Sequence, residues 1–199
     1  MARISALVRR KQLVDAAFRV IRNEGFQAAT TRRVCAEAGA SLAAFHYCFS
    51  SKEEMLVELT EQTVAELVGA QVDAVEIRGT AAESLQASLR FYWSTVEAEP
   101  GREAVLMALT QQSLNDPALA GIAEKQYEAY RRVAMETLVQ IADGCNVTWT
   151  LPMDQLARMI IVVTDGVTLG WLVDKDGEAA VAALDAFALG LAGYAVARD

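Results

Sequence analysis

Apolar side chains recur at intervals of three and four positions along almost the whole chain. This spacing places them on one face of an α-helix, and no stretch sustains the alternation that is typical of a β-strand. Only three prolines interrupt the 199 residues, and the periodicity pauses where proline or glycine occurs. The pattern therefore predicts an all-α protein whose helices are separated by short turns.

The first fifty residues predict three helices, of which the last two are short. The first helix has one apolar face and stops at Gly25. The second, at 31–38, ends before Gly39, and the third, at 42–49, follows Ser41, whose hydroxyl suits an N-cap. Helices of about two turns cannot bury a core alone, so we expect both to pack against the first helix.

The rest of the chain predicts longer helices. Ser51 and Glu54 fit a capping box, in which the serine hydroxyl accepts from the Glu54 amide while the carboxylate returns to the cap. A long helix then runs to about Val75. Further helices are expected at 81–98, 102–113, 119–143, 153–173 and 178–197.

The two short helices and the glycine turn between them have the layout of a helix-turn-helix, whose second helix enters the major groove of DNA. The formal charge of the whole chain is −8, which by itself disfavours a nucleic-acid partner. The charge is divided unevenly, because residues 1–52 hold nine Lys or Arg against three Asp or Glu and the remainder carries −14. A basic segment that coincides with the helix-turn-helix favours DNA binding.

The side chains on the outward faces of the short helices sort by the DNA groups that they suit. Arg32 or Arg33 is the candidate for direct base reading, because a guanidinium matches the two acceptors of guanine. Leu42 and Ala44 offer apolar contact, and Arg3, on the N-terminal arm, could reach an adjacent minor groove. The groups that suit phosphates are those of Thr31, Ser41, Tyr47 and Lys52. The candidate DNA-contacting residues are Thr31, Arg32, Arg33, Ser41, Leu42, Ala44, His46, Tyr47 and Lys52.

The polar face of the first helix is also basic. Its side chains are either an ordinary solvated helix face or groups that steer the DNA backbone. They are Arg9, Arg10, Lys11, Arg19 and Arg22.

Cysteine and histidine usage disfavours metal and enzyme chemistry. Three cysteines without a CxxC pair, together with a single histidine, form no zinc-ligand set and fit a reducing compartment. Cys48 has a second interpretation as a redox-sensing thiol beside the DNA face. No combination of Ser, Asp and His suggests a nucleophile with its base. We therefore expect no enzyme activity, no cofactor and no metal.

Two further observations bear on localisation. The N-terminal residues lack the apolar segment of a signal peptide. The longest apolar run, 159–173, contains Asp165 and is shorter than the ~20 residues that span a bilayer. We expect a cytoplasmic protein without a membrane partner.

The last two predicted helices carry wide apolar faces interrupted by glycine, which suggests close helix approach. A helix that is apolar on more than one side is buried on more than one side. A two-fold four-helix interface between two copies meets that requirement, and it sets two recognition helices one DNA turn apart, ~34 Å. The other interpretation is that these helices only complete the core of one copy.

The middle helices mix aromatic and soft side chains with a few polar groups, as a mostly apolar ligand pocket does. The candidate ligand-binding residues are Trp93, Met107, Gln111, Tyr127, Thr164 and Asp165. Asp165 interrupts an apolar stretch, and a buried carboxylate is costly unless it is paired. A cationic ligand, a neighbouring arginine and the second copy of the chain are equally suitable partners for it.

Residues 9–59 resemble the N-terminal domain of the tetracycline-repressor (TetR) family of bacterial transcriptional regulators. The matching segments are Ala16-Ala17-Phe18, Glu24-Gly25-Phe26, Ala29-Thr30-Thr31, Ala36-Glu37-Ala38-Gly39-Ala40-Ser41, Phe45-His46-Tyr47-Cys48-Phe49 and Ser51-Lys52-Glu53-Glu54-Met55-Leu56. The family usually has Gly where Ala43 stands, Tyr where His46 stands and His where Cys48 stands. These departures put the operator sequence in question, not the fold.

The resemblance implies a homodimer with an all-helical C-terminal domain that binds a small molecule and is then released from a palindromic operator. We expect DNA binding by residues 1–50, and ligand binding and dimerisation by residues 51–199. The predicted function is that of a ligand-responsive, sequence-specific repressor of transcription. The alternative is a protein-binding regulator or co-repressor of the same fold that contacts DNA weakly.

Overall fold

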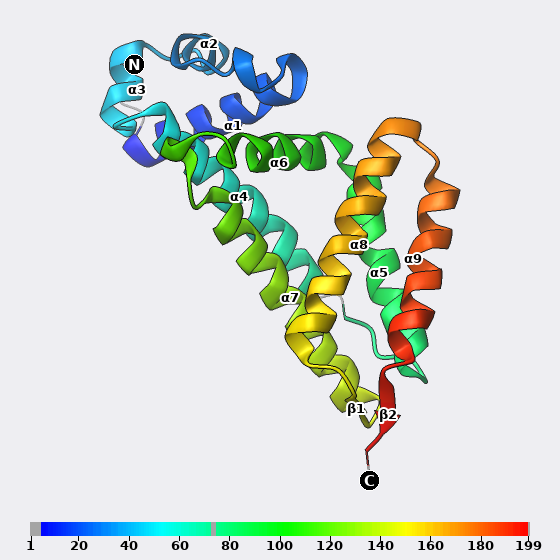
Figure 1. Cartoon of the computed structure of the whole chain (residues 1–199). Helices are drawn as coiled ribbons and strands as arrows, with labels where there is room; N and C mark the ends of the chain where they lie inside the picture. Colours follow the sequence, from blue (N-terminus) through cyan, green and yellow to red (C-terminus); the bar gives the residue numbers. More distant parts are fainter. Residues whose placement is uncertain (1–4, 73–74, 199) are drawn as a thin grey trace. The chain divides into compact units, whose positions relative to one another are not determined.

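The structure, a computed structural model, describes residues 5–72 and 75–198 (Figure 1). Its helices confirm the predicted all-α class. In chain order the elements are α1 (Ala6–Glu24), the 3-10 turn η1 (Phe26–Ala28), α2 (Thr31–Glu37), α3 (Leu42–Cys48), α4 (Lys52–Val72), α5 (Ala81–Ala98), α6 (Pro100–Ser113), the 3-10 turn η2 (Pro117–Leu119), α7 (Ile122–Gly144), β1 (Val147–Trp149), α8 (Met153–Asp174), α9 (Gly177–Ala192) and β2 (Ala195–Ala197).

The described residues form two compact units. Unit 1 comprises the chain up to Ala65 together with Gly101–Gln126, and unit 2 comprises Glu66–Pro100 and the chain from Tyr127 onward. The helices α4 and α7 contribute residues to both units. The predicted division at residue 50 stays a prediction.

Unit 1 is built around α1. The buried face of α1 packs against α2 and α3, as the short helices require, and Phe45 and Phe49 are almost fully buried beside it. Burial of each such side chain stabilises the fold by about 1.5–3 kcal/mol. Val105 of α6 and Leu119 of η2 belong to the same core cluster. The two-turn helices are therefore stable because they complete a larger core.

Unit 2 is a helical layer in which α9 packs against both α5 and α8 (Figure 1). The connection between α8 and α9 is a tight turn, because Lys175 has a left-handed backbone (φ 61°) and its amide donates to the Trp171 carbonyl at 2.8 Å. The side chain of Asp176 then caps α9 by accepting from the Ala179 amide at 2.9 Å. The short turn expected between the helices at 153–173 and 178–197 is confirmed.

The structure corrects the expected end of the last helix. The prediction continued the helix to Ala197, whereas α9 ends at Ala192 and Ala195–Ala197 form β2. This strand pairs antiparallel with β1, with Val147 opposite Ala197 and Trp149 opposite Ala195. Three-residue strands are too short to leave an alternating pattern, so the sequence carried no signal for them.

The helix α8 is apolar beyond what its own unit covers. Among the described residues it is the helix whose length and composition would suffice to cross a membrane, which is weak evidence for a span by itself. Only 22% of its most apolar window is buried. Much of the apolar surface of α8 is therefore exposed in a single copy of the chain.

Candidate nucleic-acid interface

A left-handed glycine sets the turn between α2 and α3. Gly39 has φ +58°, a backbone conformation that side chains rarely adopt, and the Ala40 amide donates to the Cys35 carbonyl at 2.9 Å. Ser41 then caps α3, because its Oγ accepts from the Ala44 amide at 3.1 Å. Both local expectations from the sequence are met, and together they present α3 as a separate short helix.

The helix α3 has one buried and one outward face. Phe45 and Cys48 are buried, whereas Leu42, His46 and Tyr47 are exposed, with 73% of Tyr47 accessible. The structure therefore turns toward solvent three of the four α3 residues that the sequence nominated.

Ala44 is less exposed than expected, and its neighbour Ala43 is more exposed than Ala44. Ala44, a nominated contact, is partly buried, and Ala43 is exposed. Ala43 precedes His46 by three positions and Tyr47 by four, which is the spacing of one helix face. That spacing was the signal by which the sequence could have identified Ala43 as an outward residue.

The adjacent arginines of α2 differ in their surroundings. The Arg33 guanidinium contacts Glu24 at 2.5 Å and Glu37 at 3.1 Å, and these carboxylates raise its pKa. The Arg32 side chain is exposed, and no ion pair holds it among the residues that the structure describes. Of the two candidates for base reading, Arg32 is the one whose donors are available.

The candidate phosphate contacts keep suitable groups available. The Ser41 hydroxyl accepts from a backbone amide, which leaves its hydrogen for an external acceptor. The Lys52 ammonium lies 4.9 Å from the centre of the Phe26 ring, at the first turn of α4. Thr31 begins α2 and is partly exposed. Arg3 lies outside the described residues.

The structure assigns Arg10 a role that the sequence did not suggest. Its guanidinium donates to the carbonyl of Cys48, the last residue of α3, and to Glu54 of α4 at 2.8 Å. It also contacts Glu58 and lies 4.1 Å from the centre of the Phe49 ring. Arg10 therefore ties α1 to the end of α3 and the start of α4.

Other basic groups of α1 are paired as well. Lys11 contacts Asp15 at 3.2 Å, and Arg19 contacts Glu37 at 2.9 Å. Arg10, Lys11 and Arg19 of α1 therefore form ion pairs with carboxylates of unit 1. They are neither a purely solvated helix face nor freely available to DNA phosphates.

The capping box at the start of α4 forms with one change. The Ser51 hydroxyl accepts from the Glu54 amide at 3.1 Å, as expected. The Glu54 carboxylate, however, accepts from the amide of Ser50 at 2.8 Å and from its hydroxyl at 2.6 Å, one residue before the expected cap. The hydrogen bonds from Ser50, and next that from Arg10, lower the pKa of Glu54 to about 2.

The cysteines and the histidine form no metal site among residues 5–72 and 75–198. Cys35 and Cys48 are buried, and burial raises the pKa of the Cys35 thiol. The burial of Cys48 removes the exposure that a redox-sensing thiol requires.

The candidate ligand-binding residues divide between the two units. Met107 and Gln111 belong to unit 1, whereas Trp93, Tyr127, Thr164 and Asp165 belong to unit 2. In unit 2 the Tyr127 hydroxyl donates to Asp165 Oδ2 at 2.5 Å, and Trp93 is 2% exposed. The Thr164 hydroxyl donates to the Ile160 carbonyl of its own helix at 2.9 Å. The partner of Asp165 among the described residues is thus the phenol of Tyr127, which is not one of the three partners expected from the sequence.

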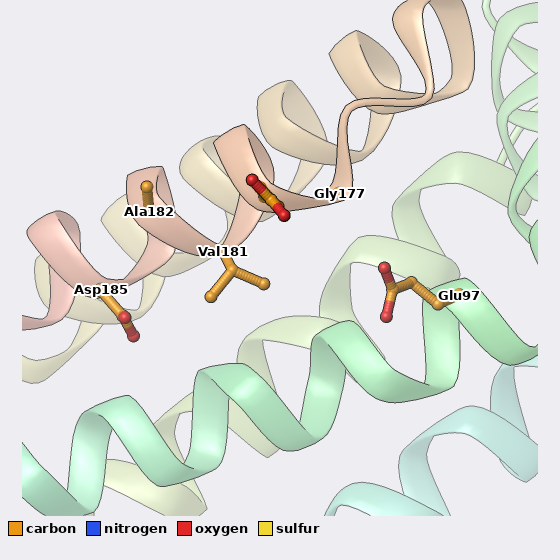
Figure 2. A pocket seen from close by; sticks show the side chains of 6 residues that line it. Glu97, Gly177, Val181, Ala182 and Asp185 are labelled. Atoms are coloured by element: carbon orange, nitrogen blue, oxygen red, sulfur yellow. The ribbon is translucent and has the colours of Figure 1, made fainter.

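An open groove of about 570 Å³ lies in unit 2 between the end of α5 and the first half of α9 (Figure 2). Figure 2 shows Glu97 of α5 pointing toward the first turn of α9. The residues that line the groove are Glu97, Gly177, Glu178, Val181, Ala182 and Asp185, and none of them was a candidate from the sequence. The Asp185 carboxylate is held by Arg90 at 2.8 Å.

Two family models match the chain. The model described as "Bacterial regulatory proteins, tetR family" matches residues 13–59, which contain the helix-turn-helix. The model described as "BetI-type transcriptional repressor, C-terminal" matches residues 81–193, more than half of the chain.

Individual proteins are similar over most of their length. The nicotine-responsive transcriptional repressor HdnoR of Paenarthrobacter nicotinovorans is 29% identical over 176 residues, which cover 86% of this chain and 88% of the relative. A transcriptional regulator from Rhodococcus sp. Rha1 has the same fold, with a TM-score of 0.78, 24% identity, and coverage of 94% of this chain and 97% of that one. A regulator from Saccharomonospora viridis, solved in complex with choline, has a TM-score of 0.73 at 20% identity and covers 89% of this chain and 94% of its own.

Proposed function

Because this chain belongs to the TetR family and is a ligand-responsive, DNA-binding regulator of transcription, we propose that it acts as a homodimeric repressor of a palindromic operator. A small molecule bound to the C-terminal region releases it. In this proposal residues 1–50 bind DNA, and residues 51–199 pair the copies and bind the effector. The role requires no catalytic activity and belongs in the bacterial cytoplasm, where the DNA is.

The outward face of α3 is the observation that carries the proposal. It combines two exposed apolar side chains, Leu42 and Ala43, with the polar groups of His46 and Tyr47. Ser41 caps the start of the helix, and Arg10 donates a hydrogen bond to the carbonyl at its end. A short rigid helix with such a face suits the major groove. Arg32 supplies the direct base contact, and Thr31, Ser41, Tyr47 and Lys52 hold phosphates.

Exposed apolar residues in unit 2 support pairing. On α8, Val162, Leu169 and Val173 are 63%, 56% and 81% exposed, and on α9 Leu189 is 58% exposed. The three α8 residues recur at intervals of seven and four, so they form one stripe along the helix. A second copy that placed its own α8 and α9 against this stripe would bury it by two-fold symmetry.

Selection of sequences from random duplex DNA by the purified protein tests the proposal. We expect enrichment of a palindrome whose half-sites lie about one DNA turn apart. Enrichment of no sequence, or of a single unpaired half-site, would contradict a dimeric repressor. Screening of small molecules for release of the enriched duplex then tests the effector.

A protein-binding co-repressor of the same fold is the alternative function. His46 is exposed on α3 where the family usually has Tyr, and this difference is the observation that favours weaker DNA contact by this face. Cys48, where the family usually has His, is buried. A gel shift with bulk DNA at low salt separates the two functions, because phosphate contacts alone give measurable binding there. Absence of any shift would favour the alternative.

A further inference from the structure

We propose that Asp165 is the counter-ion for an organic cation that binds in unit 2 beside the rings of Tyr127 and Tyr130, so that the effector is an amine or a quaternary ammonium compound. The inference rests on the proposed function, because it names the chemical class of the small molecule that the regulator senses. It concerns only residues of α5, α7 and α8 that belong to unit 2.

The carboxylate of Asp165 has a neutral hydrogen-bond partner and no ion pair among the described residues. It lies in the middle of the apolar helix α8, is half-buried, and accepts a hydrogen bond from the neutral Tyr127 hydroxyl. No lysine or arginine pairs with it in the part of the chain that the structure describes. Burial raises the pKa of Asp165, which reflects the cost of holding this charge away from water. A bound cation would offset that cost.

Aromatic rings adjoin the carboxylate. The ring centres of Tyr127 and Tyr130 are 5.8 Å apart and the rings are tilted by 52°. Tyr127 is 38% exposed, so its ring is open to a ligand. Ring faces attract cations such as methylated ammonium groups, and they do so more strongly when a carboxylate balances the charge.

The polar-aromatic pattern continues along α8. Asp165, Thr168 and Trp171 follow one another at intervals of three residues, so each lies beside the next on the helix surface while the row turns by about 120° around the helix. Thr168 Oγ1 lies 2.7 Å from the Tyr92 hydroxyl oxygen, and the ring of Trp171 meets that of Trp93 edge-on at 5.2 Å between centres.

The buried end of this row has an unused donor. The indole nitrogen of Trp93 is buried without a hydrogen-bond partner among the described atoms. Buried donors are normally paired, so an unpaired one is an exception that an acceptor atom on a ligand would remove. Among the described residues, a carboxylate without a paired lysine or arginine and an indole N–H without an acceptor therefore both belong to the side chains on and around α8.

The groove of Figure 2 is a poorer cation site although it is also acidic. One of its carboxylates, Asp185, is already neutralised by Arg90, and no aromatic side chain lines the groove. A monocation there would meet solvent-exposed carboxylates only, where screening weakens the attraction.

Calorimetric titration of the full chain with three probes tests the assignment. The probes are choline, protonated nicotine, and 3,3-dimethylbutan-1-ol, which has the shape of choline without its charge. We expect at least one cation to bind saturably, and we expect Asp165→Asn to weaken that binding at least about tenfold. The neutral alcohol should bind at least about tenfold more weakly than choline, with no difference between the wild type and the variant. Asp154→Asn, the same substitution at an exposed site on α8, should leave cation affinity within about twofold.

Tyr127→Phe provides a second variant that separates charge from packing. It removes the competing hydroxyl but leaves the ring and the carboxylate, so cation affinity should be kept or increased. Binding of the neutral alcohol as tight as that of choline, an unchanged affinity in Asp165→Asn, or no binding of either cation at millimolar concentration would overturn the assignment. A protein that selects a palindrome but is released only by neutral or anionic molecules would overturn it while leaving the proposed function intact.

Discussion

At the scale of single residues, adjacent side chains of one type have different roles because their partners differ. Arg33 is held by two carboxylates of unit 1, and its neighbour Arg32 extends into solvent. An arginine that is already paired would have to break those contacts before it could read a base. The pair therefore gives a matched test of which side chain reads DNA.

The first prediction concerns these two arginines. We expect Arg32→Ala to relax the preference at one base pair of each half-site by about 1–3 kcal/mol, with little change in the melting temperature. Arg33→Ala should lower the melting temperature and leave the sequence preference unchanged. Competition binding with single-base variants of the selected operator, together with thermal melts, measures both. A change of base preference in Arg33→Ala alone would reverse the assignment.

The second prediction concerns the pH dependence that Glu54 introduces. Its pKa is lowered to about 2 in the folded protein, whereas an unfolded glutamate titrates near ~4.3. The contacts of the ionised carboxylate therefore stabilise the fold fully above the unfolded value, and this stabilisation is lost as the pH falls toward the folded value. Glu54→Gln should be less stable than the wild type at neutral pH, and the difference should shrink between about pH 4 and pH 2.

Urea unfolding at a series of pH values measures this difference. The matched control is Glu53→Gln, which removes a neighbouring carboxylate from the same first turn of α4. No hydrogen bond to a side chain engages Glu53 in the described part of the chain. A difference between the wild type and Glu54→Gln that stayed constant with pH would contradict the role given to this carboxylate.

At the scale of secondary-structure elements, α3, the proposed recognition helix, is positioned from both ends. Ser41 caps its start, and Arg10 of α1 reaches the carbonyl at its end while also contacting α4. Unpaired carbonyls at a helix end are usually satisfied by water or by local caps. Here a side chain distant in sequence satisfies one, which links the orientation of α3 to both longer helices.

The third prediction tests that link. Arg10→Ala removes one donor from the Cys48 carbonyl and from each of two carboxylates, and we expect a loss of about 1–2 kcal/mol in the free energy of unfolding. Arg10→Lys should recover only part of this loss, because an ammonium cannot form the forked contacts of a guanidinium. Lys11→Ala, which removes only an exposed ion pair with Asp15, should cost less than about 0.5 kcal/mol. Chemical denaturation measures all three variants, and equal losses at Arg10 and Lys11 would exclude a linking role.

At the scale of the whole molecule, the charges and the apolar surface lie in different parts of the chain. The basic residues concentrate before residue 53, and the acidic excess follows them. The apolar stripe of α8 consists of exposed valine and leucine side chains. Exposed apolar side chains that lie together in this way favour association with another protein surface. The proposed surfaces for DNA and for a second copy thus lie in separate parts of the chain.

The fourth prediction concerns assembly. Val162→Glu places a charge in the α8 stripe, so we expect a folded monomer and a loss of operator affinity of about 100-fold, because the two half-sites are no longer bound together. Val139→Glu is the matched control, since Val139 is an exposed valine of α7 at 44% accessibility. Light scattering after gel filtration measures the mass. A Val162→Glu protein that remained dimeric would exclude α8 from the interface.

The sequence by itself determined the all-α class, the positions of most helices, the Ser41 cap and the helix-turn-helix, but it placed the end of the last helix at Ala197 instead of Ala192. Helical periodicity, the Gly39 turn and the Ser41 cap depend on residues three or four positions apart, so a local pattern suffices to predict them. The resemblance carried by the same segment led to the family, which is confirmed. The candidate DNA-contacting and ligand-binding residues and the domain division stay predictions.

Only the tertiary structure decided how individual side chains are used. Arg10 meets Cys48 across 38 positions, Tyr127 meets Asp165 across 38, and β1 pairs with β2 at the far end of α9. The exposed stripe of α8 likewise became visible only when neighbouring helices covered its other faces. Contacts between residues distant in the chain depend on the packing of whole helices, and that packing leaves no spacing in the sequence from which the partners can be identified.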